Sequence, residues 1–318
     1  MLVKRIAFKN ATAALFVLST ALTASCGSST VRVAARPSPA PSPVQDCRGA
    51  TEVDPSYSAP SGVEFHTLQV DGKLRDYRVF RPSTIGTSKP VPLVVVLHGS
   101  PADAQSFEDV IHFDNEAVAG KFMTAGPNGC NGYWSYTERG PYQVDEDFIR
   151  KMISDLETAY AVDRSRIYVV GASAGSWVAY RLACDMADVI AAAVSISGSM
   201  RVSDSCEPAK PVSILEMHGT LDTVLPWQGG GPHLAFPVEA VIHRWVALDG
   251  CSVGPLSSKA GITTTSVWSH CAGGVQVRLD AVVGGLHQWF GSDFSPVPGE
   301  PNANAAIWNF FRSVPART

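Results

Sequence analysis

The stretch that decides the fold is RIYVVGASAGS, residues 166–176. An apolar, β-branched run is followed at once by the pattern Gly-x-Ser-x-Gly, which extends from Gly171 to Gly175. This order predicts a buried strand, a sharp turn and the start of a helix, with Ser173 exposed at the turn. The two glycines leave room for a strained backbone and for close packing of helix on strand. The stretch therefore predicts a nucleophilic serine at a strand end.

A second apolar run, VPLVVVL at residues 91–97, lies upstream and ends in His98–Gly99–Ser100. Such a run predicts a strand that is buried on both faces, as in a parallel sheet. A His-Gly turn after an early strand can direct one backbone N–H toward a reacting carbonyl oxygen. We therefore expect an oxyanion hole formed by the backbone N–H groups of Ser100 and Ala174.

Two more strands are predicted to deliver an acid and a base. Residues 211–217 form an apolar run that leads to Asp222, and residues 281–283 lead through two glycines to His287. An aspartate beyond a strand end is suited to orient a histidine that takes the proton of a serine. The chain order of Ser173, Asp222 and His287 is that of α/β-hydrolases. These three residues are the predicted catalytic set.

Other histidines and aspartates are less suited to the same roles. His218 stands in a turn beside the acid, and His270 neighbours Cys271. We expect both histidines to be structural, His218 through a backbone hydrogen bond. Asp188 and Asp204 are poorer acids because no predicted strand delivers them.

Five segments of the chain together resemble the secreted polyhydroxybutyrate depolymerase/feruloyl esterase family of α/β-hydrolases, a group that includes actinobacterial lipoprotein esterases. The segments are LHGS at 97–100, VDRSRIYVVGASAG at 162–175, YRLAC at 180–184, HGTLD at 218–222 and GGLHQW at 284–289. The resemblance extends from about Val63 to the C-terminus. It implies that the catalytic serine, acid and histidine are Ser173, Asp222 and His287. It also implies short-chain, hydroxyalkanoate or feruloyl-type aryl esters as substrates.

The sequence departs from that family pattern close to the histidine. Leu286 stands where the family often has glycine, and Trp289–Phe290–Gly291 replaces the usual Trp-Pro-Gly. We expect the Leu286 side chain to narrow the acyl pocket and to favour acetyl or butyryl esters. Trp134, in the aromatic loop 131–136, and Trp227 are either walls of a substrate cleft or members of a packed cluster.

The predicted reaction is ester hydrolysis through an acyl-enzyme, with no cofactor. Two alternatives are acyl transfer to a cell-envelope acceptor and a catalytically inactive, tethered binding lipoprotein. The complete serine, aspartate and histidine set argues against the binder, which needs none of the three. Neither C-x-x-C nor H-E-x-x-H occurs, so no metal site is expected. The net charge of −4, without a basic cluster after the N-terminus, makes nucleic acid an unexpected partner.

The N-terminus is predicted to be a targeting segment. Basic side chains within residues 4–9 precede a short apolar run at 11–24, which indicates a signal peptide over residues 1–25. The small residues before Cys26 resemble a bacterial lipobox, and lipidation of Cys26 would anchor an exported protein at the membrane. The alternative is ordinary cleavage and secretion, with Cys26 as a spare thiol.

A proline-rich linker over residues 26–46 is predicted to separate Cys26 from a catalytic domain over residues 47–318. The domain contains six cysteines, and an exported chain of this kind is expected to form three disulfides. Six cysteines allow 15 pairings. Proximity in the chain favours the pairs Cys184–Cys206 and Cys251–Cys271, which leaves Cys47–Cys130.

The alternation of predicted strands and helices indicates an α/β-hydrolase fold. It has a mostly parallel, doubly wound sheet with helices on both faces and no large lid domain. An antiparallel edge hairpin is expected around Asp71–Gly72, with strands over 63–70 and 75–82. Apolar residues spaced three or four positions apart predict helices over 148–160 and 238–246.

Overall fold

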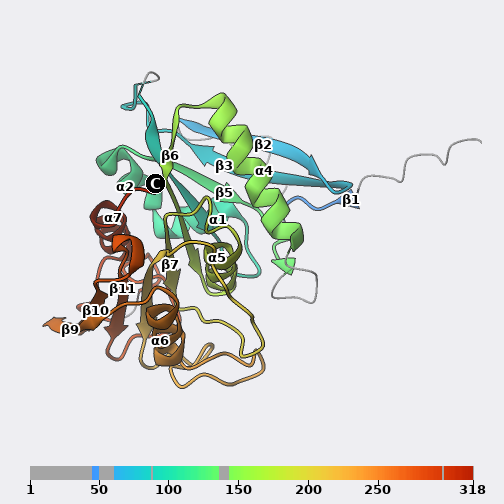
Figure 1. The fold of residues 1–318 in the computed structure, drawn as a ribbon. Helices are drawn as coiled ribbons and strands as arrows, with labels where there is room; N and C mark the ends of the chain where they lie inside the picture. The colour runs from blue at the N-terminus through green and yellow to red at the C-terminus, as the bar shows by residue number, and fades with distance from the viewer. Residues whose placement is uncertain (1–44, 50–60, 87–88, 136–142, 296, 318) are drawn as a thin grey trace, which may run out of the picture. The chain divides into compact units, whose positions relative to one another are not determined.

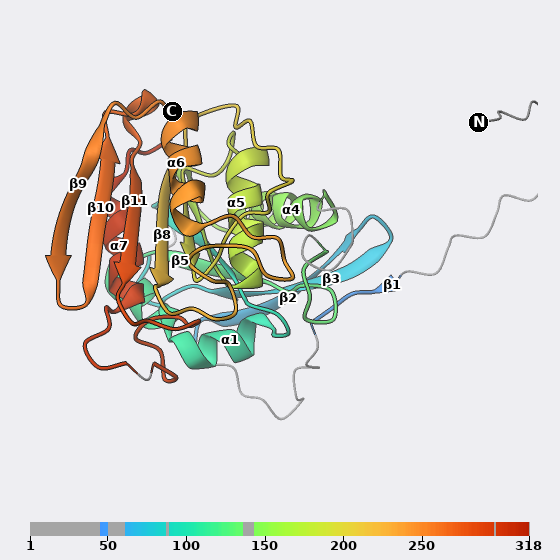
Figure 2. The ribbon, with the colours of Figure 1, turned by 90° about the horizontal axis from the view of Figure 1, so that it is seen from below.

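The centre of the domain is an 11-stranded sheet, seen in a computed structural model that describes residues 45–49, 61–86, 89–135, 143–295 and 297–317. The predicted signal peptide, Cys26 and the linker up to residue 44 lie outside the described residues. Figures 1 and 2 show the sheet with its flanking helices. The strands are β1 (Gln45–Asp46), β2 (Val63–Val70), β3 (Lys73–Phe80), β4 (Val91–Leu97), β5 (Met123–Pro127), β6 (Val162–Ala172), β7 (Ala192–Ile196), β8 (Ser213–Gly219), β9 (Val253–Ala260), β10 (Thr263–Ser269) and β11 (Val277–Val282).

The helices alternate with these strands along the chain. They are α1 (Ala104–Ile111), α2 (Phe113–Gly120), α4 (Gln143–Ala159), α5 (Ala174–Asp185), α6 (Val238–Leu248), α7 (Ala303–Ser313) and the short 3-10 helix η1 (Ala272–Gly274). Among the described residues, none of the helices combines the length and apolar character needed to cross a membrane.

The strand order is β1-β3-β5-β4-β6-β7-β8-β11-β10-β9, with β2 paired to β3. From β5 to β11 neighbouring strands run parallel, whereas the pairs at the two edges, apart from β1 with β3, are antiparallel. The carboxyl ends of the parallel strands therefore lie side by side at one end of the sheet, which is where ligands bind in open α/β sheets. The predicted mostly parallel sheet is confirmed.

Both faces of the central strands are buried. In β4, Leu93 and Val95 pack in the apolar cluster that contains α4, α5 and α6, while Val94 and Val96 pack in the cluster that contains α2 and α7. This arrangement explains why the strand reads as a continuous apolar run rather than an alternating one. Helices on both faces of the sheet are thus confirmed as well.

The predicted edge hairpin is present as β2 and β3, which pair antiparallel from Val63 opposite Phe80 to Val70 opposite Lys73. Its two turn residues, Asp71 and Gly72, both have positive φ, at 50° and 73°. Positive φ at both residues is typical of a two-residue hairpin turn, whose twist matches that of the two flanking strands.

The boundary predicted at residue 47 needs a small correction. Gln45 and Asp46, assigned to the linker, form β1 and pair in parallel with Lys73 and Leu74. The backbone N–H of Cys47 also bonds the carbonyl of Leu74. Backbone hydrogen bonds to an exposed sheet edge leave no apolar pattern in the sequence, so the two residues could not be recognised as a strand.

Candidate active site

Ser173 lies in the one-residue step between β6 and α5. Its backbone has φ 52° and ψ −118°, a conformation that L-amino acids rarely adopt. A Cβ at Gly171 would collide with the carbonyl oxygen of Gly175, and a Cβ at Gly175 would collide with that of Leu97. The two glycines are therefore required for the close crossing of α5 over the strands, and this crossing lifts Ser173 out of the sheet.

The predicted acid and base reach the same place from neighbouring strands. Asp222 follows β8 and His287 follows β11, and both strands end at the edge where β6 presents Ser173. The Nδ1 atom of His287 is 2.7 Å from Asp222 Oδ2, and its Nε2 atom is 2.9 Å from Ser173 Oγ. A carboxylate on Nδ1 holds the proton on that nitrogen and leaves Nε2 free to accept the serine proton.

The carboxylate of Asp222 is itself held firmly. Its Oδ1 atom accepts the backbone N–H groups of Val224 and Leu225, each at 2.8 Å. Burial raises the pKa of Asp222, but hydrogen bonds from His218 and His287 outweigh this effect and leave the pKa well below its usual value. Asp222 is therefore ionised at neutral pH and can stabilise a positive charge on His287.

The expected oxyanion donors, Ser100 and Ala174, both line a cavity at Ser173. Ala174 is the first residue of α5, so its N–H has no partner within the helix. The Gly99–Ser100 peptide is fixed by His98, whose Nδ1 donates to the Gly99 carbonyl over 2.6 Å. Because N–H and C=O point in opposite directions in a trans peptide, this bond also sets the direction of the Ser100 N–H.

His98 is held in turn by Gly129 and Trp134. Its Nε2 accepts the Gly129 N–H at 3.0 Å, and its carbonyl accepts the indole N–H of Trp134 at 2.8 Å. The rings of His98 and Trp134 stack with centroids 4.7 Å apart. Burial lowers the pKa of His98 to about 4, so the ring is neutral and keeps its single proton on Nδ1.

The positions of Trp134, Trp227 and Leu286 do not match the prediction that their side chains contact the substrate. Trp134 is fully buried beneath His98, so the packed-cluster alternative applies to it. Trp227 is half-buried with its ring edge-on to His218, at 6.0 Å between centroids. Leu286 is 40% exposed, and neither it nor Trp227 lines the two cavities at Ser173. The sequence shows an aromatic or bulky residue near a motif but not the direction of its side chain.

The other candidate residues lie elsewhere. His218 is fully buried beside Asp222, and its Nε2 donates to the carbonyl of Leu225 at 2.9 Å, the kind of bond that was expected. Asp188 pairs with an arginine of α4, and Asp204 accepts a backbone N–H from its own loop. His270, after β10, contacts Ser269. None of these residues belongs to the hydrogen-bonded series of Asp222, His287 and Ser173.

Two cavities meet at Ser173 and share Ser100. The first contains Ala174 and extends over Trp177; its remaining lining residues are Arg201, Val224, Leu225 and His233. The second contains His287 and is mainly apolar; its lining includes Phe107, Trp289, Pro101, Ala102, Ser197 and Gln288. Phe107 and Trp289 contact each other edge to face, with centroids 5.5 Å apart. Sequence reasoning missed Phe107, Arg201 and His233, which lie outside every motif.

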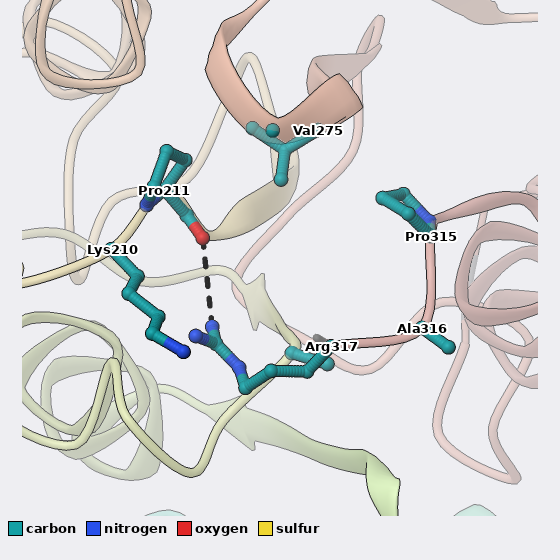
Figure 3. Close-up of a pocket in the computed structure, with 8 residues that line it drawn as sticks. Lys210, Pro211, Val275, Pro315, Ala316 and Arg317 are labelled. Carbon is teal, nitrogen blue, oxygen red and sulfur yellow. Dashed lines mark hydrogen bonds between the residues drawn. The ribbon is translucent and has the colours of Figure 1, made fainter.

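A third hollow, drawn in Figure 3, lies at the amino ends of the parallel strands, away from the carboxyl ends that carry Ser173. It is lined by Ala191, Pro211 and Val275, which come just before β7, β8 and β11. Arg317 enters it and donates to the carbonyls of Ala187, Ile190 and Pro211. Arg317 thus fills the hollow and binds backbone carbonyls, which fixes the segment that follows α7 against the sheet.

The three disulfides join the pairs that proximity in the chain favoured. They are Cys47–Cys130, Cys184–Cys206 and Cys251–Cys271. Cys130 follows Gly129, the residue that holds the His98 ring, and Cys206 lies in the loop between β7 and β8 that carries Arg201. Two of the disulfides thus stabilise loops next to Ser173.

Sequence comparison places the chain among relatives that are named as esterases. Feruloyl esterase B of Piromyces equi is 29% identical over 224 residues, which are 65% of this chain and 41% of that relative. Feruloyl esterase C of Emericella nidulans is 27% identical over 258 residues, covering 77% of this chain and 86% of the relative. The chain spans less than two thirds of the length of the first curated relatives that it matches. No protein-family model matches the chain.

Solved structures give the same fold. Acetyl xylan esterase from Aspergillus awamori superposes with a TM-score of 0.56 at 14% identity, covering 78% of this chain and 99% of that one. A feruloyl esterase module from Clostridium thermocellum, complexed with sinapinate, has a TM-score of 0.55 at 12% identity and covers 80% of this chain and 91% of that one. The described chain has the α/β-hydrolase fold.

Proposed function

We propose that the protein hydrolyses carboxylic esters through an acyl-enzyme formed on Ser173. The observation that carries the proposal is the line of hydrogen bonds from Asp222 through His287 to Ser173 Oγ. Nucleophile, base and orienting acid are in contact, and Ser100 and Ala174, the expected oxyanion donors, line the same cavity as Ser173. The esterase names of the relatives support the same reaction class.

The reaction follows from these positions. Ser173 Oγ attacks the ester carbonyl carbon while its proton moves to His287 Nε2, and the backbone N–H groups of Ala174 and Ser100 stabilise the oxyanion. The bond to the alcohol oxygen then breaks, and His287 returns its proton to the departing alcohol. A water molecule, deprotonated by His287, attacks the acyl-enzyme and releases the acid. The charge on Asp222 stabilises the imidazolium in both halves.

The two cavities differ in which half of the ester they suit. The departing alcohol must lie within reach of His287, so the cavity that contains His287, Phe107 and Trp289 suits the alcohol part. The cavity over Trp177, which contains Ala174, suits the acyl part. We propose short-chain, hydroxyalkanoate or aryl acyl groups as the substrate class. The feruloyl and acetylxylan esterase names among the relatives support the aryl and short-chain members of this class.

Hydrolysis of a series of 4-nitrophenyl esters tests this proposal. The wild type is expected to release nitrophenol with a burst followed by a steady rate, and a fluorophosphonate probe is expected to label the peptide that contains Ser173. Ser173→Ala should lose both signals. Ser269→Ala, a matched change on β10, should keep them. Turnover that survives in Ser173→Ala would overturn the assignment of the nucleophile.

We also propose that the protein is exported and anchored by lipid on Cys26. Three disulfides support an oxidising compartment. Mass spectrometry of the mature N-terminus is expected to find a diacylglyceryl group on Cys26, and Cys26→Ala should release the protein from membranes or leave uncleaved precursor. Soluble secretion of the wild type with an unmodified N-terminus would contradict the anchor while leaving the esterase proposal intact.

A further inference from the structure

The acyl-side cavity has a distinct chemical character. Its two ionisable lining residues, Arg201 and His233, are both basic, and the described residues that line it include no carboxylate. The alcohol-side cavity, in contrast, has the aromatic pair of Phe107 and Trp289 on its wall. The two halves of the site are therefore suited to chemically different groups.

Trp177 organises the basic side chains. It is the fourth residue of α5, one turn after Ser173, and is 4% exposed. The guanidinium carbon of Arg201 lies 5.6 Å from the centre of its ring, and the imidazole of His233 contacts it edge-on at 6.3 Å. A guanidinium above an indole face is held in orientation by the ring and directs planar N–H donors sideways.

The backbone around these side chains is fixed by pairing between two loops. The loop after β7 carries Arg201 and the loop after β8 carries His233. Arg201 and Ala235 form an antiparallel bridge, and the N–H of Phe236 bonds the carbonyl of Met200 at 2.9 Å. Asp204 accepts the backbone N–H of Arg201 at 2.8 Å. The position of Arg201 relative to Ser173 is thus built into the fold.

We infer that this cavity binds an anionic group on the acyl part of the substrate, so that half esters of dicarboxylic acids are cleaved in preference to neutral esters. The far carboxylate would accept N–H donors from Arg201, with His233 beside it, while the ester carbonyl lies at Ser173. The inference rests on the proposed esterase function, and it adds a substrate class that the names of the relatives do not give.

The experiment compares two benzyl esters of nearly equal shape. Benzyl hydrogen succinate carries the carboxylate, and benzyl succinamate replaces it with a neutral amide. Release of benzyl alcohol is measured for both. The wild type should show a kcat/KM that is about 10-fold or more higher for the charged ester, which corresponds to one charge-assisted hydrogen bond. Raising NaCl to about 1 M, where the Debye length is about 3 Å, should reduce this ratio.

Arg201→Gln should bring the ratio to about 1. Arg244→Gln is the matched control, because Arg244 donates to the carbonyl of Asp204 in the same loop but does not line the cavity. His233→Gln offers a second variant on the other loop and should reduce the ratio in part.

Equal cleavage of the two esters by the wild type, or a preference that persists in Arg201→Gln, would overturn the inference. Cleavage of benzyl succinamate without a preference for benzyl hydrogen succinate would contradict the inference but would agree with the proposed esterase function. Failure of both esters together with absent fluorophosphonate labelling of Ser173 would instead count against the proposed function itself.

Discussion

His218 Nε2 lies 3.4 Å from Asp222 Oδ2, the same oxygen that binds His287. That nitrogen also faces the carbonyl of Leu225, which can only accept, so it must carry a proton. The Nδ1 atom faces Glu216 at 2.8 Å, and Glu216 also accepts the hydroxyl of Tyr180. Burial lowers the pKa of His218, but hydrogen bonds to Asp222 and Glu216 outweigh it and raise the pKa to about 10. A buried cation thus lies between two carboxylates.

Replacing His218 by glutamine should be strongly destabilising, because it leaves Glu216 and Asp222 buried without the cation between them. We expect the free energy of unfolding at pH 7 to fall by about 3–5 kcal/mol. The double variant Glu216→Gln/His218→Gln removes one carboxylate as well and should recover part of the loss. Urea unfolding measures both, and a double variant that is less stable than the single one would contradict the ion cluster.

The same cluster predicts a pH dependence of stability. Since the pKa of His218 in the folded state is raised above 6.5, its contribution is complete below pH 6.5 and is lost as the pH rises through about 10. The difference in stability between the wild type and the double variant should therefore shrink between pH 8 and about 10. A constant difference over this range would mean that His218 is not charged in the folded protein.

Asp222→Asn should keep the fold but lose activity. An asparagine cannot stabilise the imidazolium and no longer requires the proton on His287 Nδ1. We expect kcat to fall about 10⁴-fold, with a smaller change in KM. Thermal unfolding of the variant, measured beside the kinetics, distinguishes this loss from misfolding. A kcat within tenfold of the wild type would mean that another group orients His287.

His98→Leu should impair the oxyanion hole without touching the triad, since it removes the hydrogen bond to the Gly99 carbonyl. We expect kcat to fall about 10²–10³-fold, the effect of losing one oxyanion donor, with KM nearly unchanged. The affinity for an alkyl boronate, which mimics the tetrahedral intermediate, should fall in parallel. Trp134→Phe removes the indole N–H bond to the His98 carbonyl but keeps an aromatic ring beside His98, and it should have a smaller effect in the same direction. Unchanged boronate affinity in His98→Leu would contradict this role.

Asp249→Asn should stabilise the protein at alkaline pH. Asp249 is fully buried; its Oδ1 accepts the Val212 N–H at 3.2 Å, while Oδ2 has no partner among the described residues. Burial raises its pKa from 3.8 to about 7, so stability is lost as the pH rises through this range. At pH 8 the variant should be more stable by about 1–3 kcal/mol, with little difference near pH 4.

Thermal unfolding across this pH range measures the Asp249 effect. Asp147→Asn, a change of an exposed aspartate on α4, serves as the control and should leave the pH dependence unaltered. If Asp249→Asn unfolds like the wild type at every pH, the carboxyl group is neutral throughout or is paired with water.

The sequence was informative where a single strand delivers a side chain to the sheet edge. Ser173, Asp222 and His287 each follow an apolar run within a few residues, so their meeting point follows from the parallel order of the strands. Arg201 and His233 could not be found in this way. Their common position depends on pairing between two loops, and neither loop has a pattern that indicates its partner.

The outer strands show the same limit in the fold. The side chains of β9 (Val253–Ala260) are all exposed, so no alternation of apolar and polar residues predicts it. Its pairing with β10 could therefore not be predicted, and the apolar run at 281–283 includes only the last two residues of β11, Ala281 and Val282. The support of His98 by Trp134 was also invisible, because stacking of two rings 36 residues apart is a tertiary contact.

The backbone conformation of Ser173, at φ 52° and ψ −118°, lowers the stability of the folded protein at the residue that the reaction needs. A non-glycine residue in such a conformation costs on the order of 1–3 kcal/mol, which glycine would largely avoid. Selection for heat resistance alone would therefore favour Ser173→Gly, a more robust but inert molecule. Laboratory evolution of this protein toward thermostability has to screen for turnover in every round, because a gain in stability is available at a position whose side chain the reaction requires.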